Sequence, residues 1–290
     1  MKVFAVCSAM VTLSLPIASK AQGLDAGRLE NTVRAEEAQL SAKIGAAVLD
    51  TKSNAVWSYR GDERFPLDST HKAFACAALL VKADRGEASL QKRVIIVATD
   101  LVAHSPITEK RIAPDAMSLS ELCAAAITVS DNTAANAVLS AIGGPPALTD
   151  FFRALGDEVS RLDRNEPDLN ESAPGDPRDT TTPAAAVVDL DKLLLADALK
   201  PAAREKLKQW MIDDAVAGTL LRAALPGDWR IADKTGAGEH GSRGIVAVLW
   251  PPDRAPIVAA IYIRDTSASL DARNAAIARI GAALVKALPR

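Results

Sequence analysis

Residues 229–265 read WRIADKTGAGEHGSRGIVAVLWPPDRAPIVAAIYIRD, and this stretch predicts three successive β-strands. Two of them, 244–252 and 256–265, are almost continuously apolar, which is typical of strands that are covered on both faces. An amphipathic helix is predicted directly after them, over 269–288. We therefore expect a sheet that carries this terminal helix on one of its faces.

The other strand signals lie near the start of the chain. Residues 43–51 and 55–61 predict two strands, with a turn at 51–54 between them. Strands at both ends of the chain around a helical middle predict an α/β fold, in which a single sheet is built from both termini.

The pattern from about residue 70 to residue 210 is helical. Ser118 followed three residues later by Glu121 is a capping-box signature, and Pro183 stands at a favoured first helical position. The predicted domains are an α/β domain at 22–65 and 213–290, and an inserted all-α domain at 66–212.

The overall composition excludes several classes of protein. The chain has 290 residues, 49% of them hydrophobic and 24% charged, which is enough to bury a sizeable core in one or two domains. A net charge of −2 and a pI of about 6.0 give no indication of binding to nucleic acid or to an anionic membrane. We expect a monomer that needs no cofactor.

The first residues are typical of a secretory signal. Lys2 precedes an apolar stretch at 3–17, and the small residues Ser19 and Ala21 come before Gln22. The apolar stretch is too short to span a bilayer, and no later segment is long enough. We expect a signal peptide at 1–21, cleavage near Ala21–Gln22, and a periplasmic or secreted mature protein.

Cys76 and Cys123 are the cysteines that remain after this signal, because Cys7 lies inside it. Two cysteines in an oxidising compartment favour a disulfide, and the alternative is two separate buried thiols. The three histidines are scattered and share no ligand spacing, so the sequence predicts no metal site.

A long segment, 161–183, is dense in charge, proline and turn-forming residues. Segments of this length without regular structure are usually functional or disordered. Arg164 and Asp179 lie near its ends and can close it with a bidentate ion pair. The alternative is a solvated, mobile segment.

Ser69 and Lys72 are three residues apart at the start of a predicted helix, so their side chains share one face. A serine hydroxyl is a poor nucleophile until a neighbour takes its proton, and a lysine with a lowered pKa can do so. This spacing alone is weak evidence, because Ser89 and Lys92 match it equally well.

Three further clusters of residues favour Ser69, rather than Ser89, as the nucleophile. The first is Ser-Asp-Asn at 130–132, the second is Glu-Pro-Asp-Leu-Asn at 166–170, and the third is Lys-Thr-Gly at 234–236. Each alone has a structural interpretation as turn or strand-end chemistry. In this order they match the motif set of class A β-lactamases and penicillin-binding proteins.

The likeness extends over essentially the whole mature chain. The stretches ITVSDNTAANAVLSAIGG (127–144), RLDRNEPDLNE (161–171) and IADKTGAG (231–238) resemble class A β-lactamases. Within that class, GGPPALTDF (143–151) and LLRAALPGDW (220–229) are most similar to the carbenicillin-hydrolysing penicillinases. The resemblance implies the serine β-lactamase fold, with a mostly antiparallel sheet. It also implies hydrolysis of penicillins, carboxypenicillins included, and resistance to β-lactams.

β-Lactam hydrolysis is acyl transfer in two steps through a covalent ester. By resemblance, Ser69 attacks the carbonyl, its backbone N–H and that of Ala237 form an oxyanion hole, and Ser130 passes a proton to the departing nitrogen. The acylation base is either Lys72 or Glu166. The resemblance implies catalytic roles for Ser69, Lys72, Ser130 and Glu166, substrate binding by Asn132, Asn170, Lys234, Thr235, Gly236, Ala237 and Arg243, and a disulfide between Cys76 and Cys123.

Four positions depart from the usual pattern of the class. Asp68 replaces an apolar or small hydroxyl residue, His104 replaces an aromatic residue at the cleft rim, and His71 is expected in the core. The carbenicillin-hydrolysing relatives often carry Arg where this chain has Lys234.

Three rival interpretations stay open at this stage. A penicillin-binding D,D-peptidase shares three of the motifs but lacks a loop that places a glutamate such as Glu166 over the ester. A β-lactam sensor stays acylated and is tethered to a membrane-spanning segment. The third alternative is a globular domain without catalytic activity, in which the four motifs would occur in this order by chance.

Overall fold

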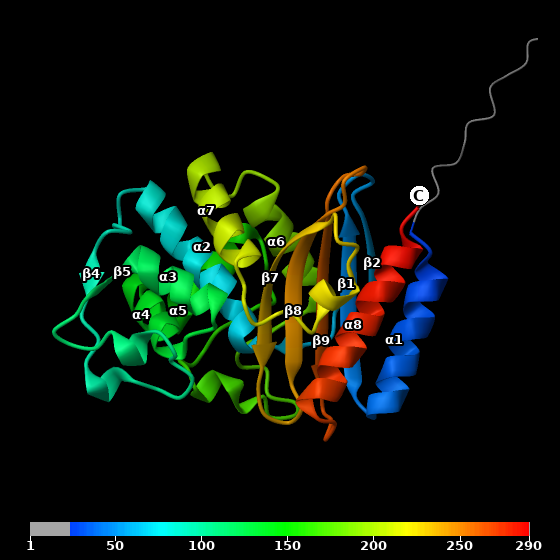
Figure 1. The fold of residues 1–290 in the computed structure, drawn as a ribbon, viewed down its shortest axis with the longest axis horizontal. Coiled ribbons are helices and arrows are strands. Elements are labelled where there is room, and N and C mark those ends of the chain that lie inside the picture. The colour runs from blue at the N-terminus through cyan, green and yellow to red at the C-terminus, as the bar shows by residue number, and fades with distance from the viewer. Residues whose placement is uncertain (1–23, 290) are drawn as a thin grey trace, which may run out of the picture.

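The computed structural model describes residues 24–289, so the predicted signal peptide lies outside the described part of the chain. At the centre is a five-stranded sheet in the order β2-β1-β9-β8-β7, in which every neighbouring pair is antiparallel (Figure 1). The predicted sheet from both termini is thus confirmed. Its strands are β1 (Lys43–Asp50), β2 (Ala55–Tyr59), β7 (Arg230–Ala237), β8 (Arg243–Trp250) and β9 (Ile257–Arg264).

Both faces of β8 and β9 are covered, as their continuous apolar character predicts. Alternate residues of β8 enter different cores: Ile245 and Ala247 face α1 (Ala26–Leu40) and α8 (Leu270–Ala287), whereas Val246 and Val248 face the helical part of the chain. The alternation follows from the period of two along a strand. In Figure 1, α1 and α8 lie side by side on one face of the sheet, opposite the other helices.

Six longer helices form the helical part. The central helix α2 begins directly after the Ser69 segment, and its residues 71–80 are all buried. The predicted capping box of α3 is present, because the Glu121 N–H donates to Ser118 Oγ at 3.2 Å and the Ser118 N–H to Glu121 Oε2 at 2.7 Å. Pro183 is the first residue of α6, as predicted. The helices are α2 (His71–Asp84), α3 (Leu119–Thr128), α4 (Asn132–Ile142), α5 (Pro145–Leu155), α6 (Pro183–Leu194) and α7 (Pro201–Ile212).

Several short elements have no clear sequence signal. They include two small ladders, the first of which pairs the segment before the Ser69 turn with the end of the long loop. The ladders are β3 (Phe65–Pro66) with β6 (Thr180–Thr181) and β4 (Arg93–Val94) with β5 (Met117–Ser118). The 3-10 turns are η1 (Asp68–Thr70), η2 (Ala98–Asp100), η3 (Thr108–Lys110), η4 (Asp168–Glu171) and η5 (Leu221–Ala224).

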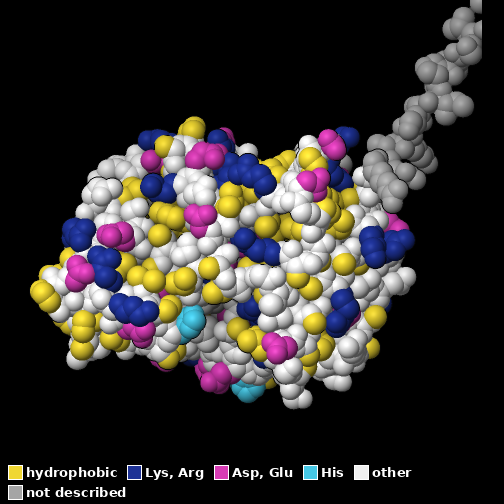
Figure 2. All heavy atoms as spheres, viewed as in Figure 1, with side chains coloured by type: hydrophobic (Ala, Val, Ile, Leu, Met, Phe, Trp, Pro, Cys, Tyr) yellow, Lys and Arg dark blue, Asp and Glu magenta, His cyan; other side chains and the backbone are white. Residues whose placement is uncertain are grey.

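The division into domains at residues 65 and 212 stays a prediction. None of the helices within 24–289 is both long enough and apolar enough to cross a membrane. On the face shown in Figure 2, acidic and basic side chains are interspersed, in keeping with the near-neutral net charge.

The predicted disulfide is absent from the structure. Cys76 on α2 and Cys123 on α3 are free thiols with no exposed surface, and Cys76 Sγ donates to the Cys123 backbone oxygen at 3.9 Å. The prediction depended on compartment and cysteine count, and neither of these determines side-chain geometry, which a disulfide restricts tightly. Burial raises the pKa of the Cys123 thiol, which makes it unreactive.

A pair of buried carboxyl groups lies at the base of the long loop. Asp157 Oδ1 accepts hydrogen bonds from the N–H groups of Val159 (2.7 Å) and Ser160 (3.0 Å), where the loop begins. Asp189 on α6 is 1% exposed, and neither of its oxygens has a hydrogen-bond partner among the described residues. Burial and then the charge of Asp157 raise the pKa of Asp189 to about 8.

We expect Asp189→Asn to stabilise the protein increasingly as pH rises. The folded wild type holds a proton on Asp189 that the unfolded chain releases near pH 4, so its stability falls between about pH 4 and pH 8, by at most about 1.4 kcal/mol per pH unit. Urea unfolding at pH 5 and pH 8.5 measures the difference. The control is Asp197→Asn at an exposed site, which should change the free energy of unfolding by the same amount at both pH values. An equal change at the two pH values for Asp189→Asn would contradict the prediction.

Candidate active site

A cleft of about 360 Å³ lies where the outer strand β7 meets the helical part of the molecule. It brings together residues from seven separate segments of the chain, including most of those predicted from the motifs. Its lining residues are Ser69, His104, Ser130, Asn132, Asn170, Val216, Thr235, Gly236, Ala237, Arg243, Leu270 and Asn274.

Ser69 lies in η1, which runs directly into α2, so its hydroxyl is held at the start of a helix. Its side chain is nearly enclosed, with 9% of the residue exposed. Lys72 follows one turn later and is completely buried. The Ser69 hydroxyl donates to Glu166 Oε1 at 3.4 Å. In contrast, Ser89 and Lys92 are exposed and lie outside any helix, so they form no such pair.

The Lys72 ammonium group lies among oxygen atoms of three residues from two segments, the Ser-Asp-Asn motif and the long loop. Its Nζ is 2.8 Å from the Ser130 backbone oxygen, 2.5 Å from Asn132 Oδ1 and 3.1 Å from Glu166 Oε1. A longer contact of 3.2 Å reaches Ser130 Oγ. Because the three acceptors compete for one buried cation, this lysine fixes their relative positions.

The Ser-Asp-Asn segment is held by its middle residue. Asp131 caps α4 through the Ala134 N–H (2.9 Å) and accepts three more hydrogen bonds from Ile107 and Thr108. Ser130 adopts a left-handed conformation, with φ of 59°, which turns its hydroxyl into the cleft. Such conformations persist only where the surroundings determine them.

Glu166 reaches the site from the long loop, and its backbone is anchored to α4. Asn136 accepts from the Glu166 N–H at 2.9 Å and donates to the Glu166 carbonyl at 2.9 Å. Asn170 Nδ2 donates to the second carboxylate oxygen, Oε2. Both carboxylate oxygens of Glu166 are therefore engaged on the cleft side of the loop.

The two central charges influence each other's protonation. Burial lowers the pKa of Lys72, although the charge of Glu166 opposes this shift. Burial alone would raise the pKa of Glu166, but the charge of Lys72 and the hydrogen bonds from Lys72 and Asn170 act together against it, so the pKa lies below its usual value. Glu166 is therefore a carboxylate at neutral pH and can accept a proton.

The Lys-Thr-Gly motif lies at the cleft end of β7. Lys234 is fully buried, its Nζ is 3.3 Å from Ser130 Oγ, and burial lowers its pKa to about 8. Gly236 is required by close packing, because a Cβ there would lie 3.0 Å from the Ser69 nitrogen. The same closeness places the strand end with Ala237 beside the Ser69 amide.

Arg243 begins β8 opposite Ala237. It donates to the Gly236 carbonyl and to Asn274 Oδ1, both at 2.8 Å. Burial lowers its pKa to about 10, so it stays charged at neutral pH. A cation at this end of the cleft suits a carboxylate ligand.

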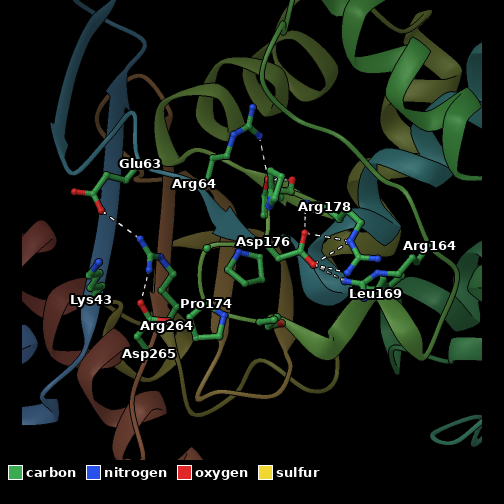
Figure 3. Close-up of a pocket in the computed structure, with 16 residues that line it drawn as sticks. Lys43, Glu63, Arg64, Arg164, Leu169, Pro174, Asp176, Arg178, Arg264 and Asp265 are labelled. Atoms are coloured by element: carbon green, nitrogen blue, oxygen red, sulfur yellow. Dashed lines mark hydrogen bonds and ion pairs between the residues drawn. The ribbon is translucent and has the colours of Figure 1, made fainter.

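The long loop is held by ion pairs in addition to its short elements η4 and β6. The predicted Arg164–Asp179 ion pair is present, but the side chains meet through one contact and not in the bidentate form expected: Arg164 Nε lies 2.6 Å from Asp179 Oδ2. Asp179 Oδ1 also accepts from two backbone N–H groups of the loop. Behind the loop is a separate cavity of about 340 Å³, where Arg164 and Arg178 both reach Asp176 (Figure 3). Ser69 does not border this rear cavity.

The three unusual residues have clear positions. His104 lines the rim of the cleft, and His71 is fully buried with its Nδ1 2.7 Å from the Asp68 carbonyl, so both expectations are confirmed. Burial lowers the pKa of His71 to about 4, which leaves it neutral. Asp68 is fully buried and does not line the cleft. Burial raises its pKa to about 6, while hydrogen bonds from Ser242 and Ser172 oppose the shift.

Sequence reasoning missed Asn136, Asn274, Val216 and Leu270. Asn136 could have been found, since it lies one helical turn after Asn132 and so shares its face. Asn274 is a polar residue on the buried side of an amphipathic helix, which is also a detectable signal. Within residues 24–289, no group of three or more His, Cys, Asp or Glu side chains has the geometry of a metal site.

Known proteins resemble the chain over nearly its full length. A profile described as "Beta-lactamase enzyme family" matches residues 28–288. Beta-lactamase AER-1 of Aeromonas hydrophila is 55% identical, over 90% of this chain and 86% of its own. Beta-lactamase PSE-4 of Pseudomonas aeruginosa is 49% identical, over 88% of each chain.

Solved structures agree with the sequence matches. The ancestral (GNCA) class A beta-lactamase superposes with a TM-score of 0.88 at 51% identity, covering 90% of this chain and 100% of that one. The chromosome-encoded beta-lactamase of Vibrio parahaemolyticus gives a TM-score of 0.87 at 45% identity, covering 89% and 98%. With a buried Ser-Lys-Glu constellation on this fold, the chain belongs to the class A β-lactamase family.

Proposed function

We propose that this β-lactamase hydrolyses penicillins through an ester formed on Ser69. The observation that carries the proposal is the position of Lys72. It is a fully buried cation that contacts Ser130, Asn132 and Glu166 at once, one helical turn from the Ser69 hydroxyl. Burying a charged ammonium group costs desolvation free energy, and a purely structural role would not require that cost.

The first step is attack of Ser69 Oγ on the lactam carbonyl. The hydroxyl already donates to Glu166 Oε1, so Glu166 is the base that this geometry favours. Lys72 lies next to the same oxygen and can take over when Glu166 is absent. The N–H groups of Ser69 and Ala237 are the donors for the developing oxyanion.

Opening the ring leaves a nitrogen that needs a proton. Ser130 Oγ is the donor in our proposal, because Lys72 and Lys234 lie 3.2 and 3.3 Å from it and can resupply the proton. Asn132 binds the side-chain amide of the penicillin. Thr235 and Arg243 bind the carboxylate on the ring, together with the charge of Lys234.

The second step is hydrolysis of the ester. Glu166 and Asn170 present a carboxylate and an amide to the same side of the cleft, where they can activate and orient a water molecule. This pair is the feature that opposes the D,D-peptidase and sensor interpretations, because it removes the acyl group. The test is repeated turnover of benzylpenicillin, followed by the loss of lactam absorbance at a large excess of substrate over enzyme. A single turnover would contradict the proposal.

Replacing Arg243 by alanine is expected to lower kcat/KM for benzylpenicillin. Removal of a charge-assisted contact of about 1.5–3 kcal/mol corresponds to a fall of roughly ten- to hundredfold. Arg243→Lys keeps the charge but not the planar donors, so it should lie between the alanine variant and wild type. An unchanged kcat/KM for Arg243→Ala would show that Lys234 and Thr235 bind the carboxylate alone.

For substrate range, we propose that penicillins and carboxypenicillins are hydrolysed well ahead of oxyimino-cephalosporins and carbapenems. Asp68 is buried away from the cleft, so it does not repel the second carboxylate of carbenicillin. Glu239 is exposed after β7, and its repulsion of acidic oxyimino groups is worth under about 1 kcal/mol. The measurement is kcat/KM for benzylpenicillin, carbenicillin, an oxyimino-cephalosporin and a carbapenem. A carbenicillin value a hundredfold below that of benzylpenicillin, or an equally good carbapenem, would contradict it.

We also propose that the protein is exported and acts as a monomer in the periplasm or outside the cell, conferring resistance to β-lactams. The secretory pattern of residues 1–21 supports export. Mass spectrometry of the protein from the periplasmic fraction tests whether the mature chain begins at Gln22.

A further inference from the structure

Asp68 is a buried carboxylate directly before the nucleophile, and the chemistry above does not use it. The residue has no exposed surface. Within 24–289 it makes no ion pair within 4.0 Å, although Arg243 and Arg273 favour its charge from further away. A carboxyl group that is buried without a paired cation is costly, so its retention beside the nucleophile needs an explanation.

Its two oxygens bind two different segments. Ser172 Oγ donates to Asp68 Oδ1 at 2.9 Å, and Ser242 Oγ donates to Asp68 Oδ2. Ser172 directly follows η4, in the loop that carries Glu166 and Asn170. Ser242 lies in the turn between β7 and β8, immediately before Arg243. One carboxyl group therefore links the nucleophile segment, the long loop and the end of β7.

The space around the carboxyl group is closely fitted. A Cβ at Gly238 would lie 2.4 Å from Asp68 Oδ1, and a Cβ at Gly236 would lie 2.8 Å from Asp68 Cβ. Asp68 itself has a φ of 42°, which is unusual for a residue with a side chain. Neighbouring backbone bonds support this turn, because the Leu67 N–H donates to the Asp179 carbonyl at 2.8 Å.

The two linked segments act in different chemical steps of the proposed function. The loop presents Glu166 and Asn170, which remove the acyl group. Glu166 also serves acylation, but Lys72 can replace it there, so deacylation depends more strongly on the loop. The β7–β8 turn sets Ala237 and Arg243, which bind the carbonyl oxygen and the substrate carboxylate. A second contact joins these segments directly, since the Glu239 N–H donates to the Asn170 carbonyl at 2.9 Å.

We infer that Asp68 is a positioning residue for both steps of the reaction: its bond to Ser172 holds the loop in place for deacylation, and its bond to Ser242 holds the strand turn in place for acylation. The inference rests on the proposed acyl-enzyme route. Ser172 and Ser242 are then positioning residues as well, because both act through Asp68. Ser172 has its main effect on deacylation, and Ser242 on acylation.

The test is separate measurement of the acylation and deacylation rate constants for benzylpenicillin, by quench-flow with mass spectrometry of the acyl-enzyme. Loss of one hydrogen bond to a charged group leads us to expect about a tenfold effect. Ser172→Ala should slow deacylation by that factor and acylation clearly less, because Lys72 lies beside the same Glu166 oxygen and can take over as the acylation base. Ser242→Ala should slow acylation, with deacylation nearly unchanged. Asp68→Ala should slow both steps.

A double-mutant cycle shows whether the serines act through Asp68. If they do, Ser172→Ala and Ser242→Ala should each have almost no further effect in the Asp68→Ala protein. Asp68→Asn keeps the shape of the side chain, with an amide oxygen that can accept from one serine and an amide N–H group that can donate to the other. Its acylation and deacylation rate constants should therefore lie close to those of wild type and well above those of Asp68→Ala. If Asp68→Ala does not fold, Asp68→Gly, which suits the positive φ and also removes both acceptors, serves as the background for the same cycle, in which each serine should lose most of its effect.

Ser160→Ala is the matched control, because it removes a buried hydroxyl directly before the same loop that bonds to Thr181 Oγ1 (2.6 Å) and not to Asp68. It should leave both rate constants within about twofold of wild type. Additive losses in the cycle, an asparagine variant as slow as alanine, or serine variants no slower than Ser160→Ala would each overturn the inference. Absence of an acyl-enzyme in the wild type would instead overturn the proposed function itself.

Discussion

Glu166→Ala is expected to open the β-lactam ring of benzylpenicillin and then remain blocked as a stable ester on Ser69. Deacylation loses its base, which is worth about 10²–10⁴-fold in rate. Acylation slows less, because Lys72 is buried beside the same site, has a lowered pKa and can accept the serine proton. Intact-protein mass spectrometry should therefore show a lasting adduct, and peptide mapping should place it on Ser69.

The control for this experiment is Glu158→Ala, which removes an exposed carboxylate just before the same loop. Its acyl-enzyme should decay as fast as that of wild type. If wild type itself retains the adduct as long as Glu166→Ala does, the protein is a β-lactam sensor or a peptidase-like acceptor. If neither protein forms an adduct, the covalent route is wrong.

Ser69→Ala is expected to abolish turnover almost completely. The remaining groups can still bind a penicillin, but no covalent intermediate can form, and loss of a serine nucleophile costs on the order of 10⁶-fold in kcat. Binding should survive, since Arg243 and Lys234 stay in place. Hydrolysis of benzylpenicillin measures the first effect, and calorimetric titration with the same compound measures the second.

Ser89→Ala is the matched control, because Ser89 and Lys92 repeat the serine-lysine spacing at an exposed site outside any helix. Its kcat/KM should equal that of wild type. Residual activity in Ser69→Ala above about one part in 10³ would show that another group on the enzyme attacks the ring.

Much of the fold could be predicted because its main signals are local. The continuous apolar runs of β8 and β9, the capping box at Ser118 and Pro183 at the start of α6 all depend on neighbouring residues. The core of the site followed from motif order, and the structure places these motifs around one cleft. The ion pair between Arg164 and Asp179 was also predictable, because opposite charges stood at the two ends of a loop.

What could not be predicted depends on contacts between distant segments. The two-residue ladder of β3 and β6 is too short to have a pattern, and it forms only because the loop returns to the segment before Ser69. The bonds of Asp68 to Ser172 and Ser242 cross 104 and 174 residues. The free thiols of Cys76 and Cys123 differ from the expected disulfide because side-chain orientation on two packed helices is invisible in a cysteine count.

The place of β1 in the sheet has a consequence for biogenesis. β1 can pair with its neighbour β2 soon after synthesis, but its other edge waits for β9, from the far end of the chain. Such distant pairings form slowly, and an open apolar edge is a template for aggregation. A nascent chain therefore remains without a completed sheet until nearly all of it has left the ribosome. For the same reason, a premature stop between Trp250 and Ile257 would leave open the edges of β1 and β8 that β9 normally covers, and we expect an aggregating product.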